Sequence, residues 1–183
     1  MRIIAGEMKG RRLKAVPGRT TRPTADKVKG AIFNVLQDRL MEAVVLDLFA
    51  GTGNLALEAL SRGAGQVVLV EKDVLAQQII EENLRLSQAN ERAHLYHMDA
   101  FTYLAHEQAV NYDIIFLDPP YHQGLVERAL NALASPCCLA QRGVIVAETA
   151  RDEDLVAPDC FEVRKTGEYG DTRIWYLQLT NGK

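Results

Sequence analysis

Cysteine is scarce in this sequence, and long hydrophobic runs are absent. The 183 residues include only three cysteines, two of them adjacent at Cys137 and Cys138. So few cannot form the paired framework that staples small secreted domains, so we predict a reducing, cytoplasmic location. No stretch approaches the roughly 18 to 20 consecutive apolar residues that cross a membrane. The first residues, Met1 to Gly6, also lack the apolar segment of a signal peptide. We therefore predict an intracellular protein without membrane contact.

The composition also lacks the bias of disordered or fibrous proteins. Apolar residues make up 48% and charged residues 25% of the chain, which are ordinary values for globular domains. At about 150 residues per domain, the length predicts one domain with a core large enough to need no metal or disulfide. The four histidines show no zinc-type spacing with cysteine, and we predict no metal site and a monomer.

Charge is unevenly distributed along the chain. Residues 1–30 contain nine Lys and Arg against Glu7 and Asp26, a balance of +7, whereas the remaining residues have a balance of −10. A basic segment on an acidic body favours contact with phosphate groups at one end of the molecule. We predict that nucleic acid binds a basic N-terminal hairpin or arm at residues 1–20, and that residues 21–183 form the main domain. The predicted RNA-binding residues are Lys9, Arg11, Arg12, Lys14 and Arg22.

Hydrophobic periodicity predicts alternating strands and helices through most of the chain. Short strands at 2–5 and 12–16 flank a glycine-containing loop, and Thr24 is expected to cap the first helix. The alternation that follows is typical of a parallel sheet covered by helices on both faces, with an antiparallel hairpin at one edge. The predicted parallel strands are 44–49, 66–70, 93–97, 112–117 and 143–148; the helices between them are 54–62, 74–88, 100–106 and 125–133; the hairpin strands are 161–165 and 172–177.

The first chemical motif follows the first parallel strand. Asp47, Gly51 and Gly53 place an acid and a flexible turn at the strand's carboxyl end, and Glu71 ends the next strand, where it could accept both ribose hydroxyls of an adenosine. The glycines also match an NAD fingerprint, and a plain turn would need no ligand. However, an acid before the glycines suits the ammonium group of a methionine moiety better than a pyrophosphate. This favours S-adenosylmethionine, and we expect loss of Glu71 from its exposed loop to affect stability little.

The second motif, Asp118-Pro119-Pro120-Tyr121, follows the fourth parallel strand. The prolines stiffen the turn, so that the Asp118 carboxylate and the Pro119 carbonyl can accept hydrogen bonds together. The Tyr121 ring can stack on a base, a role that does not need its hydroxyl group. Two acceptors beside a flat ring suit an exocyclic amine on a planar base. We therefore predict catalytic roles for Asp118, Pro119 and Tyr121.

Further cofactor contacts are expected beside these motifs. Asp99 follows the third strand and could accept from an adenine amino group, although an acid at this position is also a common helix cap. Phe49 and Ala100 are adjacent to the predicted ligands. The predicted cofactor-binding residues are Asp47, Phe49, Gly51, Gly53, Glu71, Asp99, Ala100 and Asp118.

Together these strings resemble one family along essentially the whole chain. They include Arg2-Ile3-Ile4-Ala5-Gly6, Lys9-Gly10-Arg11, Thr21-Arg22-Pro23-Thr24, Phe33-Asn34, Leu46 to Gly53, Glu58 to Ala64 and Asp118 to Tyr121. The sequence is similar to the RsmD family, bacterial 16S rRNA (guanine(966)-N2)-methyltransferases. Asn54 departs from the small residue more usual there.

The resemblance implies a class I methyltransferase fold, Rossmann-like, with a seven-stranded, mostly parallel sheet. It also implies S-adenosylmethionine as methyl donor and 16S rRNA of the assembling small ribosomal subunit as substrate. Two alternatives remain open from the residues themselves. One is an N6-adenine or N4-cytosine methyltransferase acting on DNA or RNA, since the second motif serves any exocyclic amine. The other is a nucleic-acid-binding module without catalysis.

Overall fold

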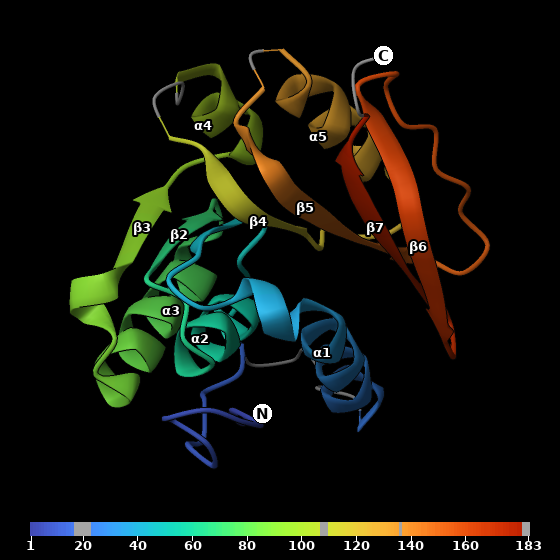
Figure 1. The fold of residues 1–183 in the computed structure, drawn as a ribbon. Coiled ribbons are helices and arrows are strands. Elements are labelled where there is room, and N and C mark those ends of the chain that lie inside the picture. Colours follow the sequence, from blue (N-terminus) through green and yellow to red (C-terminus); the bar gives the residue numbers. More distant parts are fainter. Residues whose placement is uncertain (17–22, 107–109, 136, 181–183) are drawn as a thin grey trace.

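The computed structural model describes residues 1–16, 23–106, 110–135 and 137–180, which form one seven-stranded sheet with helices on both faces (Figure 1). The strands lie in the order β3-β2-β1-β4-β5-β7-β6. Their bounds are β1 Val44–Asp47, β2 Gln66–Glu71, β3 Ala93–His97, β4 Tyr112–Leu117, β5 Leu139–Ala150, β6 Phe161–Tyr169 and β7 Thr172–Leu179.

Strands β1 to β5 pair in parallel, whereas β7 pairs antiparallel with both β5 and β6. This is the class I S-adenosylmethionine-dependent methyltransferase fold, and the predicted parallel sheet with a C-terminal antiparallel hairpin is confirmed. Strand β1 has β2, the next strand in the chain, on one side and β4 on the other. The carboxyl end of β1 is therefore the switch point at which open α/β sheets form ligand crevices.

The helices are divided between the two faces of the sheet. In Figure 1, α1, α2 and α3 lie on one face and α4 and α5 on the other. Short 3-10 helices, η1 and η2, follow α1 and α3. The bounds are α1 Pro23–Leu36, η1 Gln37–Arg39, α2 Asn54–Ser61, α3 Val74–Ser87, η2 Asn90–Arg92, α4 Ala100–His106 and α5 Leu125–Leu133.

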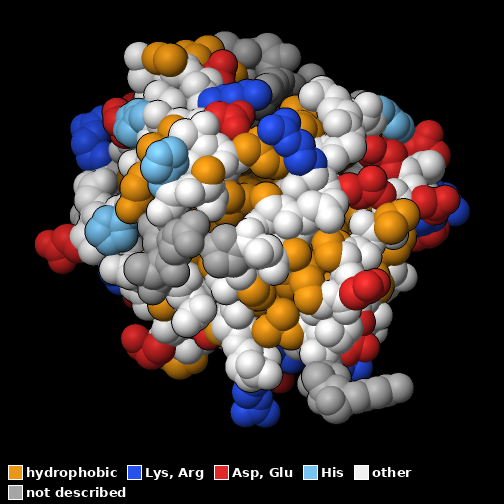
Figure 2. All heavy atoms as spheres, turned by 90° about the horizontal axis from the view of Figure 1, so that it is seen from above, with side chains coloured by type: hydrophobic (Ala, Val, Ile, Leu, Met, Phe, Trp, Pro, Cys, Tyr) orange, Lys and Arg blue, Asp and Glu red, His pale blue; other side chains and the backbone are white. Residues whose placement is uncertain are grey.

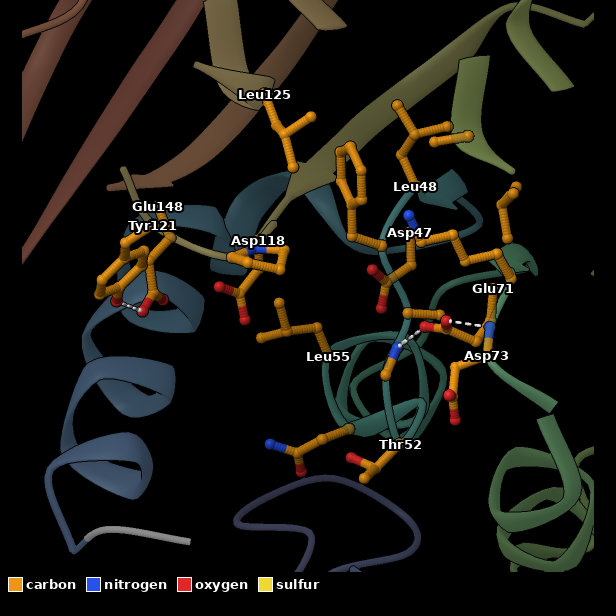
Figure 3. A pocket seen from close by; sticks show the side chains of 18 of the residues that line it. Asp47, Leu48, Thr52, Leu55, Glu71, Asp73, Asp118, Tyr121, Leu125 and Glu148 are labelled. Carbon is orange, nitrogen blue, oxygen red and sulfur yellow. Dashed lines mark hydrogen bonds between the residues drawn. The ribbon is translucent and has the colours of Figure 1, made fainter. Parts of the chain in front are cut away.

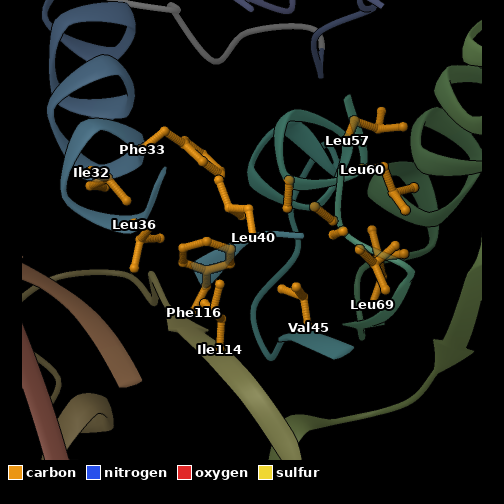
Figure 4. Packing of buried hydrophobic residues seen from close by; sticks show 14 of the residues in the cluster. Ile32, Phe33, Leu36, Leu40, Val45, Leu57, Leu60, Leu69, Ile114 and Phe116 are labelled. Carbon is orange, nitrogen blue, oxygen red and sulfur yellow. The ribbon is translucent and has the colours of Figure 1, made fainter. Parts of the chain in front are cut away.

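Alternation along the central strands divides the core into two hydrophobic clusters. On β4, Ile114 and Phe116 belong to the cluster beneath α1 and α2, whereas Ile115 and Leu117 belong to the one beneath α4 and α5. Successive side chains of a strand point to opposite faces, so a doubly covered strand must be apolar throughout. Figure 4 shows the first cluster, in which Phe33 and Phe116 pack with ring centroids 5.7 Å apart.

Residues 1–16 pack against α2 and α3 and contribute to this same core. The predicted hairpin is reduced to a single antiparallel bridge between Arg2 and Arg12. Ile3, Met8 and Leu13 are buried in the cluster beneath α1 and α2. Gly6, with φ +84°, approaches α2 so closely that an added Cβ would lie 1.6 Å from the Ser61 carbonyl oxygen. Only glycine fits this position.

Three expectations about local structure need correction. Helix α1 begins at Pro23, so Thr24 lies inside the first turn and does not precede it; proline's fixed φ suits that first position. Strand β5 begins at Leu139, four residues before the predicted start at Gly143. The hairpin strands extend further than the predicted ends at 165 and 177, because β6 ends at Tyr169 and β7 at Leu179. Within the described ranges, no helix has the length and apolar character to cross a membrane.

Candidate active site

A cavity of about 640 Å³ opens at the carboxyl ends of β1, β2 and β4 (Figure 3). This volume is typical of sites for small molecules and cofactors. The two predicted motifs meet there, because β1 pairs with both β2 and β4. The predicted site residues that line it are Asp47, Phe49, Gly51, Glu71, Asp99, Ala100, Asp118 and Tyr121.

Asp47 ends β1 and is buried, and its carboxylate points into the cavity (Figure 3). Its Oδ1 atom has no hydrogen-bond partner among the described residues. Burial raises the pKa of Asp47 to about 7; the Glu71 carboxylate adds to this, whereas the backbone amides of Ala56 and Phe49 oppose it. A buried carboxylate oxygen without a partner requires a hydrogen-bond donor. A donor that is itself a cation would also favour the ionised form of Asp47. The site therefore fits an ammonium group.

Glu71 supports the turn that contains the two glycines. Its Oε2 accepts from the Gly51 amide at 2.7 Å and its Oε1 accepts from the Asp73 amide at 2.8 Å. Gly53 does not line the cavity; it precedes α2 with φ +74°, where an added Cβ would meet Leu69 Cδ2 at 3.2 Å. The half-buried Glu71 is thus a bracing residue, and the expectation that its loss would leave stability little changed does not fit these contacts.

An apolar wall lies beside these acids. The Phe49 ring meets the Phe101 ring edge-on, with centroids 6.3 Å apart, and Arg128 lies over Phe101 at 3.7 Å. Asp99 Oδ1 accepts from the Phe101 amide at 2.9 Å, so the acid does cap α4. Its Oδ2 lies 3.9 Å from Lys72 Nζ. An apolar wall with an acid at its edge can receive a flat heterocycle that carries an amino group.

The opposite wall is built from β4, β5 and the turn between β6 and β7. The Tyr121 hydroxyl donates to Glu148 Oε1 and lies 3.0 Å from Thr172 Oγ1. The hydroxyl is therefore used within the protein, and the expectation that only the ring matters is incomplete. Burial, followed by the Glu148 carboxylate, raises the pKa of Tyr121, so the hydroxyl keeps its proton.

Asp118 and Glu148 form a pair of acids on this wall. Asp118 is exposed to the cavity yet enclosed by protein, and this environment raises its pKa well above the ordinary value, with Glu148 and then Asp47 adding to the effect. Burial also raises the pKa of Glu148, and the Tyr121 hydroxyl opposes this. Perturbed acids in a cavity mark a functional site.

Pro119, the remaining predicted catalytic residue, is buried behind this wall. It lines a smaller neighbouring cavity of about 170 Å³, whereas Pro120 lines the main one. Glu148 and Thr172 were not foreseen. A signal for Glu148 existed, because an acid that directly follows the apolar run 144–147 on the strand beside β4 must come close to Asp118.

A buried ion network below the cavity was also missed. Lys29 is 2% exposed and donates to the Arg2 carbonyl and to Asn54 Oδ1, both at 2.7 Å. Its Nζ lies 3.1 Å from Glu58 Oε2, while Arg62 Nε donates to Glu58 Oε1 at 2.8 Å. Desolvation lowers the pKa of Lys29, although Glu58 opposes the shift. Lys29 is therefore a structural cation and is unavailable to phosphate.

The predicted RNA-binding residues lie outside the cavity. Lys9 and Arg12 are exposed and make no ion pair with any described residue, whereas Lys14 pairs with Glu82 and Arg11 donates to the Leu86 carbonyl at 3.4 Å. Arg22 falls outside the described residues. The N-terminal segment is at the bottom of Figure 1; the opposite face, in Figure 2, carries only scattered Lys and Arg among hydrophobic and acidic groups.

Comparison with known proteins places this architecture in a family. The profile of the family described as Conserved hypothetical protein 95 matches residues 1–178. Ribosomal RNA small subunit methyltransferase D of Haemophilus influenzae is 35% identical over 167 residues, covering 90% of this chain and 86% of the relative. The protein of the same name from Escherichia coli strain K12 is 36% identical over 156 residues, covering 85% and 77%.

Solved structures agree with these matches. Escherichia coli yhhF superposes with a TM-score of 0.88 at 33% identity, covering 98% of this chain and 97% of that one. A methylase structure from Haemophilus influenzae gives a TM-score of 0.84 at 31% identity, covering 98% of each chain. With a family profile that matches residues 1–178 and relatives of 35 and 36% identity over most of both chains, this protein belongs to the RsmD family.

Proposed function

We propose that this protein transfers a methyl group from S-adenosylmethionine to the exocyclic N2 amine of a guanine in 16S rRNA of the small ribosomal subunit. The observation that carries the proposal is the meeting of the two motifs in one cavity. Asp47 and Glu71 lie on its cofactor side, and Asp118 and Tyr121 lie on the wall opposite. We propose that the protein acts in the cytoplasm as a monomer, without a metal.

The cofactor side fits S-adenosylmethionine in charge and shape. The unpartnered Oδ1 of buried Asp47 would accept from the ammonium of the methionine part. Glu71 stands at the end of β2 for the ribose hydroxyls, with Gly51 allowing close approach of the backbone. Asp99 and the backbone at Ala100 border the apolar wall of Phe49, which would take the adenine. Each of these groups lines the cavity.

Residues of the other wall would activate the amine. A guanine N2 lone pair is delocalised into the ring, so it is a weak nucleophile. Asp118, which lines the cavity, would accept from one of its N–H groups and favour a pyramidal amine, and with its raised pKa it would take the released proton. S-adenosylmethionine, when bound, supplies a methyl group on cationic sulfur that the lone pair can take, leaving a neutral thioether. Positioning and directed charge would supply most of the rate.

The substrate assignment is supported by the relatives named small subunit methyltransferase D and by the basic N-terminal segment. Met1 of this segment lines the cavity, so RNA held by Lys9 and Arg12 would lie near the reacting base. A base within paired RNA cannot reach a cavity of this kind, and the target must be unstacked or flipped.

The test is nucleoside analysis by mass spectrometry of small-subunit rRNA. Particles from a strain lacking the gene are treated with the purified protein and S-adenosylmethionine, and we expect one N2-methylguanosine to appear. N6-methyladenosine or N4-methylcytidine in its place would overturn the guanine assignment. Cofactor binding by calorimetry without methylation of any RNA or DNA would favour a binding module.

A further inference from the structure

Glu148 is an acid of the cavity that neither predicted motif contains. Leu117, the last residue of β4, pairs with Ala147 of β5, so Asp118 and Glu148 each follow a residue of this pair, and Glu148 itself pairs with Ile174 of β7. The two carboxylates therefore lie side by side, and both line the cavity (Figure 3). The position of Glu148 is fixed by the sheet itself and does not depend on a mobile loop.

The carboxylate of Glu148 is held in one orientation. The Tyr121 hydroxyl donates to its Oε1, and Thr172 Oγ1 lies 3.0 Å from the same hydroxyl. In the described part of the chain, no group donates to Oε2. One oxygen is thus anchored and the other is available to a ligand. An anchored carboxylate with a free oxygen is suited to accept one hydrogen bond of defined direction.

The charge of this wall calls for a ligand that donates hydrogen bonds. Of the lysines that line the cavity, Lys29 is paired with Glu58, and Lys72, which is largely exposed, lies 3.9 Å from Asp99. Of the adjacent acids, Glu148 is the one with a hydroxyl donor, which favours its ionised form. A cationic group bound on the Asp47 side would favour ionisation of both. Adjacent acceptors then require adjacent donors.

Only one of the candidate bases presents adjacent donors beside its amine. Guanine has N1–H next to its N2 amine, whereas adenine and cytosine place a ring-nitrogen acceptor next to theirs. With the amine on Asp118, an acceptor lone pair would face the Glu148 carboxylate and be repelled. A site built to accept a hydrogen bond strongly rejects an analogue that lacks the donor.

We propose that Glu148 selects guanine by accepting a hydrogen bond from N1–H through Oε2, with Tyr121 and Thr172 as positioning residues. This inference rests on the proposed function and deepens it, because it gives the reason for guanine over the other amino bases. It assigns Tyr121 a second task besides stacking. The pair formed by Asp118 and Glu148 then divides the work: one acid engages the reacting amine and the other identifies the base.

The test uses 2-aminopurine, which keeps the amine at C2 but has an acceptor at N1. Small-subunit rRNA is assembled by splinted ligation with guanosine or 2-aminopurine riboside at the position that the parent methylates, and is then reconstituted into particles. Single-turnover methylation is measured for the parent, for Glu148→Gln and for Thr172→Val. The amide of Glu148→Gln can still accept from Tyr121 while donating to N1 of 2-aminopurine.

We expect the parent to prefer guanosine by at least about tenfold, as for one directed base contact. In Glu148→Gln this preference should fall at least tenfold, while Thr172→Val, which removes one partner of Tyr121 but keeps the Glu148 carboxylate, should lose speed on both substrates and lower the preference less. Calorimetry with S-adenosylmethionine checks that each variant is folded.

Two results would overturn the inference. One is an active Glu148→Gln that keeps the parent's preference. The other is equal methylation of the guanosine and 2-aminopurine substrates by the parent. This second result can be interpreted without any variant. Either leaves the proposed function intact, since guanosine is still methylated. Failure of the parent on guanosine, with methylation of adenine or cytosine instead, would remove the proposed function as well.

Discussion

The two walls of the cavity are built in different ways. On the cofactor side, the Gly51 amide and Glu71 are bonded across only 20 residues, from one β-strand end to the next. On the base side, Tyr121 is bonded to Thr172 across 51 residues, and to Glu148 on another strand. The cofactor wall is a local motif, whereas the base wall exists only once the antiparallel hairpin has joined the sheet. Substitutions in the cofactor wall should therefore mainly lower the affinity for S-adenosylmethionine, and substitutions in the base wall should mainly lower turnover.

The largest expected effect is on turnover and comes from Asp118. Asp118→Ala removes an acceptor from the amine and should lower the single-turnover rate by about 10² to 10³. Asp118→Asn keeps an acceptor oxygen and should fall between this variant and the parent. The affinity for S-adenosylmethionine, measured by calorimetry, should change far less than the rate. If Asp118→Ala methylates as fast as the parent, the base wall is wrongly assigned.

Asp47 should show the opposite pattern, with a loss of affinity. Asp47→Asn removes the charge that faces the ammonium group and should weaken S-adenosylmethionine binding by about 10- to 100-fold, as for a charged hydrogen bond. Calorimetry at several pH values should also show that the affinity of the parent for S-adenosylmethionine decreases when the pH is lowered below about 7, because Asp47 then takes up a proton.

The same residue gives a stability test without ligand. In the folded parent the pKa of Asp47 is about 7, above the ordinary value of 3.8, so the folded state binds more protons between these values. The free energy of unfolding must therefore fall as the pH rises from about 4 through 7. Asp47→Asn should lack this loss and gain stability relative to the parent at pH 8. Equal pH profiles in thermal unfolding would contradict the raised pKa.

Glu71 should affect both properties, because it braces the turn as well as facing the ribose. Glu71→Ala leaves the amides of Gly51 and Asp73 without their acceptor and should cost about 1 to 3 kcal/mol of stability. Glu71→Gln keeps one acceptor oxygen and should lose less. Thermal unfolding and calorimetry on the same samples give both values. A fully stable Glu71→Ala with weak binding would restore a purely ligand-binding role.

The smallest effect is expected from the basic segment, which lies outside both walls. Replacing exposed Lys9 and Arg12 with Gln should reduce the slope of log K against log salt for RNA by about 1 to 2. Lys14→Gln, which breaks the pair with Glu82, should change the slope less. Filter binding over a salt series would measure this. An unchanged slope in the double variant would place the RNA elsewhere.

The sequence predicted what local patterns determine. The sheet could be predicted from the apolar runs of β1 and β4. The cofactor wall could be predicted from the acids and glycines at the ends of the strands, because these features depend on neighbours along the chain. Glu148 was missed because its partner Tyr121 lies 27 residues away along the chain, in the turn after β4. Lys29 was missed because its burial depends on Glu58, which lies in another helix. Long-range pairing of polar groups has no periodic signature.

Glu58 also has a consequence for the order of folding. It accepts from the backbone amides of Ile4 and Ala5, and Asn83 accepts from that of Lys14. During synthesis residues 4 to 14 leave the ribosome before α3 and must therefore wait until α3 has been made before they can dock fully. A stalled nascent chain ending before Asn83 should keep its N-terminus open to protease. Met1, although made before every other residue that lines the cavity, is thus placed only after the glycine turn and Glu71 have been made.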